Sequence, residues 1–114
     1  MSIEFEDVSD TLRRIRLTGR LDIAGTEAIA LKLANLTSSA QRRIVVDLCG
    51  VDFLASIGIR ELISSAKSLQ MRGSRMVLLV VPGSSVAKTL TVTGIDTLIP
   101  MLTSSPEADQ AALA

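Results

Sequence analysis

A serine stands where a short loop meets a long amphipathic stretch of the chain. Residues 47–60 read DLCGVDFLASIGIR, and the serine is Ser56. At the start of a helix its hydroxyl would accept a hydrogen bond from a backbone N–H of the first turn, which contributes about 1 kcal/mol of stability. The same place, at the carboxyl end of a sheet strand, is where open α/β folds gather their ligands. The spacing is therefore typical both of a helix cap and of a binding site.

The neighbours of Ser56 favour a surface that another molecule contacts. Leu54 and Ile57 place apolar side chains on both sides of it, and these need not all fit inside the domain. Gly58 weakens the helix at a point where another backbone could approach closely. We therefore expect the loop to be a contact surface as well as a helix start.

The chain contains few of the residues and motifs that catalysis, metal binding or nucleotide binding requires. The chain has no His and a single cysteine, Cys49, which excludes a typical zinc site and a Cys–His nucleophile pair. Neither the P-loop spacing nor the dinucleotide fingerprint occurs. Asp22, Asp47 and Asp52 are the carboxylates that could do acid–base work, but strand-end Asp residues are more often caps or turn formers. We expect no enzyme activity, no metal and no cofactor.

The composition indicates a globular domain without a net charge that would attract an oppositely charged partner. Hydrophobic residues make up 47% of the 114 residues and aromatic residues only 2%, so the core must be mainly aliphatic. Twelve Lys and Arg balance twelve Asp and Glu, and no net field attracts nucleic acid or anionic lipid. Two short basic groups, at residues 13–16 and 42–43, are interpreted as solvated ends of strands and helices.

The sequence also favours a cytoplasmic location. Cys49 cannot form an internal disulfide, which is typical of a reducing compartment. The first residues, MSIEFE, are acidic and lack the pattern of a signal peptide. No apolar run is long enough to cross a bilayer, and we expect no membrane insertion.

Apolar periodicity predicts alternating strands and helices. Strands are expected at 3–5, 12–17, 43–48, 76–81 and 97–102, the first two antiparallel and joined near Ser9-Asp10. Helices are expected at about 26–37, 57–72 and 84–94 and from Ser105 onward; the second has the clearest apolar stripe and a Gly73 cap. The pattern predicts one α/β domain over residues 1–114, with a mixed sheet of four to five strands and about four helices.

Three segments carry a family resemblance through their order and spacing. They are 16–22 (RLTGRLD), then 44–48 (IVVDL) with 51–59 (VDFLASIGI), and then 77–82 (VLLVVP) through 93–95 (TGI). Together they resemble STAS domains, and within that family the bacterial anti-sigma-factor antagonists. The resemblance covers nearly the whole chain and implies a STAS-like fold.

The resemblance implies a partner switch. In such proteins the unphosphorylated antagonist binds an anti-sigma factor that is also a serine kinase with an ATP-binding fold, and binding frees the sigma factor. The kinase phosphorylates the serine at the start of the second helix, here Ser56, and a metal-dependent serine phosphatase reverses the reaction. Asp22 matches a family acid close to that serine. The expected partner-binding residues are Asp22, Leu54, Ala55, Ile57, Gly58 and Arg60.

The loop departs from the family's usual Asp-Ser-Ser-Gly or Asp-Ser-Thr-Gly. Here it reads Ala55-Ser56-Ile57-Gly58, which keeps the acceptor serine and lacks the preceding acid and the second hydroxyl. Two alternatives stay open. One is a STAS adaptor that regulates a non-sigma pathway or docks on a membrane transporter, with Ser56 only a cap. The other is an enzyme or small-nucleotide binder that uses the same loop.

Overall fold

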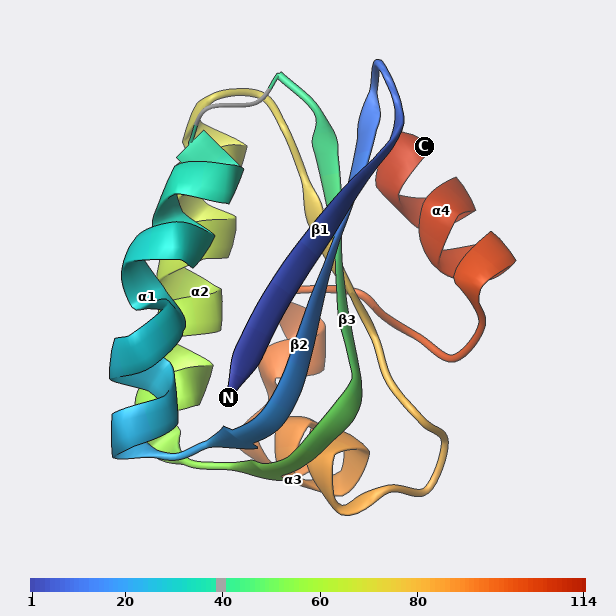
Figure 1. Cartoon of the computed structure of the whole chain (residues 1–114). Coiled ribbons are helices and arrows are strands. Elements are labelled where there is room, and N and C mark those ends of the chain that lie inside the picture. Colours follow the sequence, from blue (N-terminus) through green and yellow to red (C-terminus); the bar gives the residue numbers. More distant parts are fainter. Residues whose placement is uncertain (39–40) are drawn as a thin grey trace.

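A five-stranded sheet with helices on both faces forms the frame of the molecule (Figure 1). The computed structural model describes residues 1–38 and 41–114. Within them the predicted α/β class, mixed sheet and number of helices are confirmed. Along the chain the elements are β1 (Ser2–Ser9), β2 (Leu12–Leu21), α1 (Ile23–Ser38), β3 (Arg43–Leu54), α2 (Ser56–Met71), β4 (Met76–Leu79), α3 (Ser85–Thr93), the 3₁₀ turn η1 (Ile95–Thr97), β5 (Met101–Leu102) and α4 (Ser105–Leu113).

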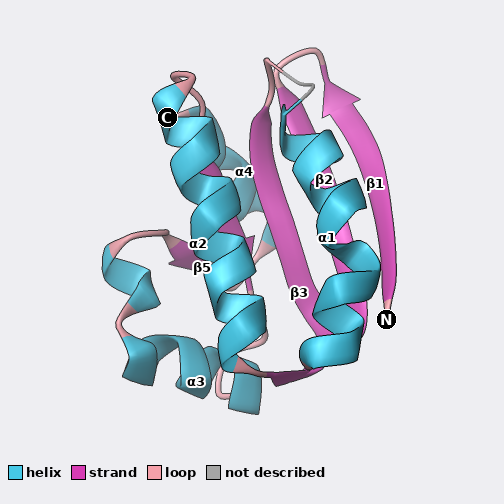
Figure 2. Cartoon of the chain, turned by 90° about the vertical axis from the view of Figure 1, so that its left-hand side faces the viewer, coloured by secondary structure: helices cyan, strands magenta, loops and turns pink. Residues whose placement is uncertain are grey.

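The sheet topology brings the starts of two helices to one edge. The strand order is β1-β2-β3-β4-β5, with β1 antiparallel to β2 and the other neighbours parallel. β2 and β3 end in register, with Leu21 opposite Leu54. The next helices, α1 and α2, begin two residues further on. They therefore start from the same edge and lie side by side on one face of the sheet (Figure 2).

Two apolar layers hold the sheet between its helices. The central strand β3 supplies both, because Ile44 and Val46 point into the layer under α1 and α2 while Val45 points to the other face. On that other face α4 covers a smaller cluster with Ala108 and Ala112. The unbroken apolar run in this strand therefore reflects burial on both faces, as parallel strands require.

Three strands are longer than the sequence predicts. β1 extends from the expected 3–5 to Ser2–Ser9. β2 continues from the expected end at Leu17 to Leu21, and β3 continues from Leu48 to Leu54. Residues 18–20 and 49–52 look like turns because they contain glycine and polar residues. In the fold they pair with each other across β2 and β3, and two register irregularities absorb the mismatch.

The second half follows the predicted order with shorter strands. β4 ends at Leu79, and the expected strand over 97–102 is reduced to Met101–Leu102 because the chain first makes a 3₁₀ turn. Of the two adjacent serines that could cap α3, Ser84 does so: its hydroxyl accepts from the N–H of Ala87 at 3.1 Å. Past α2, Gly73 has a φ of 77° and its N–H donates to Gln70 O, as a helix C-terminal glycine does.

Two basic residues of β2 are not the solvated strand ends that the sequence suggests. The Arg14 side chain is 17% exposed and pairs with Asp109 of α4 at 2.6 Å. Arg13 is only 8% exposed. Its guanidinium pairs with Asp7 at 2.6 Å, donates to Leu36 O at 2.9 Å and lies 4.9 Å from the ring centroid of Phe5. Arg13 thus ties β1 and α1 to β2, which is a structural task.

Candidate functional site

Ser56 is the first residue of α2, and its side chain is exposed. The helix cap is the preceding residue, Ala55, with extended backbone and no side-chain cap. The interpretation of Ser56 as the cap is therefore wrong. Pairing with β2 moves the start of the helix, because the Ala55 N–H donates to Leu21 O at 2.9 Å and keeps the chain extended through Ala55. The Ala55 carbonyl then accepts from the N–H groups of Gly58 and Ile59. The hydroxyl of Ser56 is left at the surface without the capping bond.

Gly58 holds the first turn of α2 close to the end of β2. It is buried, and a Cβ at this position would lie 3.0 Å from Leu21 Cβ, 3.0 Å from Leu54 Cδ1 and 3.1 Å from Leu21 O. A backbone does approach this glycine, as expected, but it belongs to the chain's own β2. Gly58 therefore positions Ser56 from inside the domain, and its burial does not favour direct contact with a partner.

The two apolar neighbours of Ser56 differ in exposure. Leu54 is 7% exposed and packs in the main core, so of the pair that need not all fit inside it is the one that does. Its place at the end of β3 explains this, because the longer strand directs it toward the helices. Ile57 is half-buried, and Ala55 is half-buried as well. Of the apolar residues expected to contact a partner, these two keep part of their surface free.

Asp22 lies at the same edge of the sheet, where it begins α1. Its Oδ1 accepts from the N–H of Gly25 at 2.8 Å, which is the hydrogen bond of a helix cap. Its other oxygen lies 3.6 Å from Nε of Arg20. Because Leu21 contacts both Ala55 and Gly58, the corner that holds Asp22 packs directly against the start of α2.

Sequence reasoning missed three exposed side chains of this edge. Arg20 lies over the ring of Phe53, 4.3 Å from its centroid, and this links the ends of β2 and β3. Phe53 is 41% exposed, and Ile23 at the start of α1 is 64% exposed. A sequence signal exists for the contact of Arg20 with Phe53: the two residues lie opposite each other once β2 and β3 are continued to their observed ends.

Arg60, one turn into α2, is exposed and makes no hydrogen bond or ion pair within the described residues.

The cysteine beside this region is not prepared for reaction. Cys49 is a free, exposed cysteine. Partial desolvation of its sulfur, together with the neighbouring Asp47 carboxylate, raises the pKa of the thiol to about 11. A thiol with this pKa stays protonated at neutral pH and is a poor nucleophile.

Within the described residues no cluster of three or more His, Cys, Asp or Glu could hold a metal, and no helix has the length and apolarity to cross a membrane.

Comparison with known proteins places this arrangement in a family. A family model described as "Mlab, STAS domain" matches residues 5–103, from β1 to the residue after β5. The chain belongs to the STAS-domain family. The match includes Asp22, Ser56 and Arg60, with the other residues of the edge described above. No curated protein is similar enough in sequence to count as a match.

Solved structures of similar fold include anti-sigma-factor antagonists. One from Mycobacterium paratuberculosis has a TM-score of 0.87 at 19% identity, covering 99% of this STAS domain and 94% of that chain. An anti-sigma-factor antagonist domain protein from Planctomyces limnophilus has a TM-score of 0.79 at 24% identity, with 98% of each chain covered. The Bacillus cell fate determinant SpoIIAA in its phosphorylated form has a TM-score of 0.70 at 22% identity, covering 96% and 99%. At these identities the likeness establishes the fold.

Proposed function

We propose that this STAS domain is an anti-sigma-factor antagonist, a cytoplasmic binding module and not an enzyme, that is switched by phosphorylation of Ser56. In its unphosphorylated form it binds an anti-sigma factor that is also a serine kinase with an ATP-binding fold. Phosphorylation releases the partner, and a serine phosphatase restores binding. The observation that carries the proposal is the exposed hydroxyl of Ser56, which makes no capping hydrogen bond.

The surroundings of Ser56 support a protein-binding surface. Two large apolar side chains stand exposed at this edge, those of Ile23 and Phe53, and could contact a partner. Ile57 adds part of its surface beside the serine. Asp22 and Arg20 supply charges around them, which would fix the orientation of a partner. An apolar centre with a charged rim is the usual composition of an interface.

A phosphate on Ser56 would change the interface and leave the fold intact. It adds about −1.5 to −2 charges at neutral pH. At the first residue of α2 these charges meet the positive end of the helix, which favours them. Arg60 is one turn away with a guanidinium that could pair with the phosphate. Against an apolar partner surface the same charges are desolvated, and a loss of about 3 to 4 kcal/mol lowers affinity several hundredfold.

The test compares serines at equivalent helix positions. Ser105 is also exposed and is the first residue of its helix, α4, but lies on the other face of the sheet (Figure 1). We expect Ser56→Asp to weaken binding to the anti-sigma kinase at least a hundredfold with an unchanged melting temperature. Ser105→Asp should leave binding unchanged. Ser56→Ala should bind constitutively and take up no phosphate.

Mass spectrometry after incubation with the kinase and ATP identifies the acceptor. Phosphate on Ser56, and its absence from the Ser56→Ala variant, is the expected result. A phosphorylated residue elsewhere, or an equal loss of folding and binding in Ser56→Asp, would contradict the proposal. A protein that takes up no phosphate and is captured with a transporter would instead be a STAS adaptor.

A further inference from the structure

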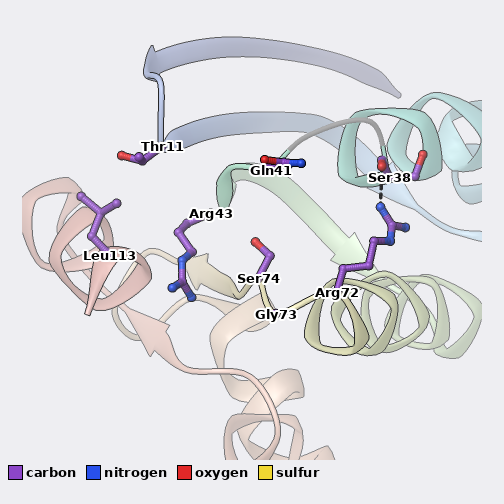
Figure 3. Close-up of a pocket in the computed structure, with 8 residues that line it drawn as sticks. All are labelled: Thr11, Ser38, Gln41, Arg43, Arg72, Gly73, Ser74 and Leu113. Carbon is purple, nitrogen blue, oxygen red and sulfur yellow. Dashed lines mark hydrogen bonds between the residues drawn. The ribbon is translucent and has the colours of Figure 1, made fainter.

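Two adjoining hollows lie at the end of the sheet opposite Ser56. The first has a volume of about 810 Å³ and lies between the start of β3, the end of α2 and the C-terminal helix (Figure 3). The second has a volume of about 610 Å³ and lies between the last turns of α2, the start of β4 and the segment before β5. Arg43, Gly73 and Ser74 line both. Their volumes fall in the range of small-molecule sites.

The lining is positively charged without compensation. Arg43 and Arg72 line the first hollow, and Arg43, Lys67 and Arg75 line the second. Among the described lining residues of either hollow there is no Asp or Glu. In a chain with no net charge, this is a local concentration of cations that a dianion would complement.

Arg43 is the arginine of this lining whose guanidinium has no partner among the described residues, and Lys67 has none either. Arg72 donates to Ser38 O, as Figure 3 shows, and to Ser68 Oγ, while Arg75 donates to Ala111 O. The Arg43 guanidinium makes no hydrogen bond or ion pair within residues 1–38 and 41–114, although the residue is half-buried. The planar fork of this guanidinium is therefore free to pair with a phosphate, whose geometry it matches.

The second hollow adds an apolar wall. Ile63 and Ala66 of α2 line it from one side, and Leu98 and Ile99 from the other. Leu98 is 64% exposed. The hollow is therefore lined by both cations and aliphatic side chains. Stacking aromatic residues, which single-stranded nucleic acid requires, are not among the lining residues, so a small molecule fits better.

We infer that this basic groove binds a small molecule with a phosphate monoester and an apolar body. The phosphate would pair with Arg43, with Lys67 and Arg75 nearby, and the body would lie against Ile63 and Leu98. Several uncompensated cations favour a dianion over a single carboxylate. The inference does not depend on the partner switch, because Ser56 begins α2 and the groove lies at its other end.

The experiment uses 1-naphthyl phosphate as the probe and records two-dimensional NMR spectra of the full chain. Shifts should be concentrated at Gly73, Ser74 and the neighbouring amides. 1-Naphthol, which lacks the charge, and inorganic phosphate, which lacks the body, should each bind at least tenfold more weakly. 1-Naphthoate, with one charge, should be intermediate.

Matched variants test which positively charged residues bind the phosphate of the probe. Arg43→Gln should weaken binding of 1-naphthyl phosphate by about tenfold to a hundredfold, since it removes a charged hydrogen-bonding partner. The backbone N–H of Arg43 donates to Thr11 O at 2.8 Å and is retained in this variant. Lys67→Gln, at an exposed helix position, tests the groove with little risk to folding and should weaken binding several-fold. Lys32→Gln on α1, exposed and outside the groove, should have no effect.

Three results would overturn the inference. They are equal binding of 1-naphthol, shifts spread over the cations of the whole surface, and binding by folded Arg43→Gln and Lys67→Gln that matches the unsubstituted protein. None of them bears on phosphorylation of Ser56, which mass spectrometry tests separately.

Discussion

Replacement of Gly58 by alanine tests whether the first turn of α2 is held by close packing. The added Cβ would lie 3.0 Å from Leu21 Cβ, 3.0 Å from Leu54 Cδ1 and 3.1 Å from Leu21 O. Ordinary contact begins at about 3.4 Å, so each neighbour must move by several tenths of an ångström. The Leu54 methyl can move by rotation, but the two Leu21 atoms are fixed to the backbone of β2.

Two opposing terms set the size of the effect. Alanine in place of glycine favours a helix by about 1 kcal/mol. Overpacking of a buried site costs about 1–3 kcal/mol, and the upper half of that range applies where the neighbours are backbone atoms. The free energy of unfolding of Gly58→Ala should therefore fall by about 1–2 kcal/mol, even though its helix propensity rises.

Urea unfolding of the variant beside a helix control measures this balance. Ser64→Ala changes an exposed position in the middle of α2 and should be neutral or slightly stabilising, because propensity is then the main term. A Gly58→Ala protein as stable as the unsubstituted chain would refute the argument that contact with Leu21 fixes this turn. In that event the placement of Ser56 would need another explanation.

Two further predictions concern polar groups away from the site. The hydroxyl of Thr26 is buried without a hydrogen-bond partner within the described residues, so Thr26→Val should raise the free energy of unfolding by about 1 kcal/mol in urea titrations; destabilisation would show that the hydroxyl is satisfied in solution. Hydrogen bonding and charge from Arg13 lower the pKa of Asp7, so its contribution is present above about pH 4 and is lost as the pH falls further. Asp7→Asn should accordingly show a smaller loss of stability between pH 5 and pH 2 than the unsubstituted protein, and equal losses would contradict the pairing.

The order of elements could be predicted because it depends on local patterns. The α2 stripe combines Leu62 and Leu69, both buried, with Ile59, Ile63 and Ala66, which are partly buried, and the sequence places all five on one face. Caps such as Ser84 depend on residues within one turn. The family resemblance adds the topology, which periodicity alone leaves open.

The site edge could be predicted only in part because its geometry comes from pairing between distant segments. The residues after Leu48 look like a loop, and pairing of Thr18 with Gly50 converts them into strand. That pairing also determines that Ala55, and not Ser56, caps the helix, since the Ala55 N–H donates to Leu21 O. The sequence identifies Ser56 as a residue of interest because it stands where a strand gives way to a helix. It assigns the Ser56 hydroxyl to a capping hydrogen bond that is not formed, because the pairing between β2 and β3 is not visible in the local pattern.

The longer β3 changes how a switch at Ser56 would work. If the strand ended at Leu48, the serine would follow a seven-residue loop, and a kinase or partner would have to order that loop at an entropic cost. In the structure a single residue separates Ser56 from β3, and Gly58 packs its turn against β2. The turn that carries Ser56 is then held against the end of β2 by Ala55 and Gly58, so little further ordering is needed on binding. Under the proposed switch, a charge added at such a fixed position would have little freedom to move away from a docked surface, and this rigidity would let one phosphate weaken the interface.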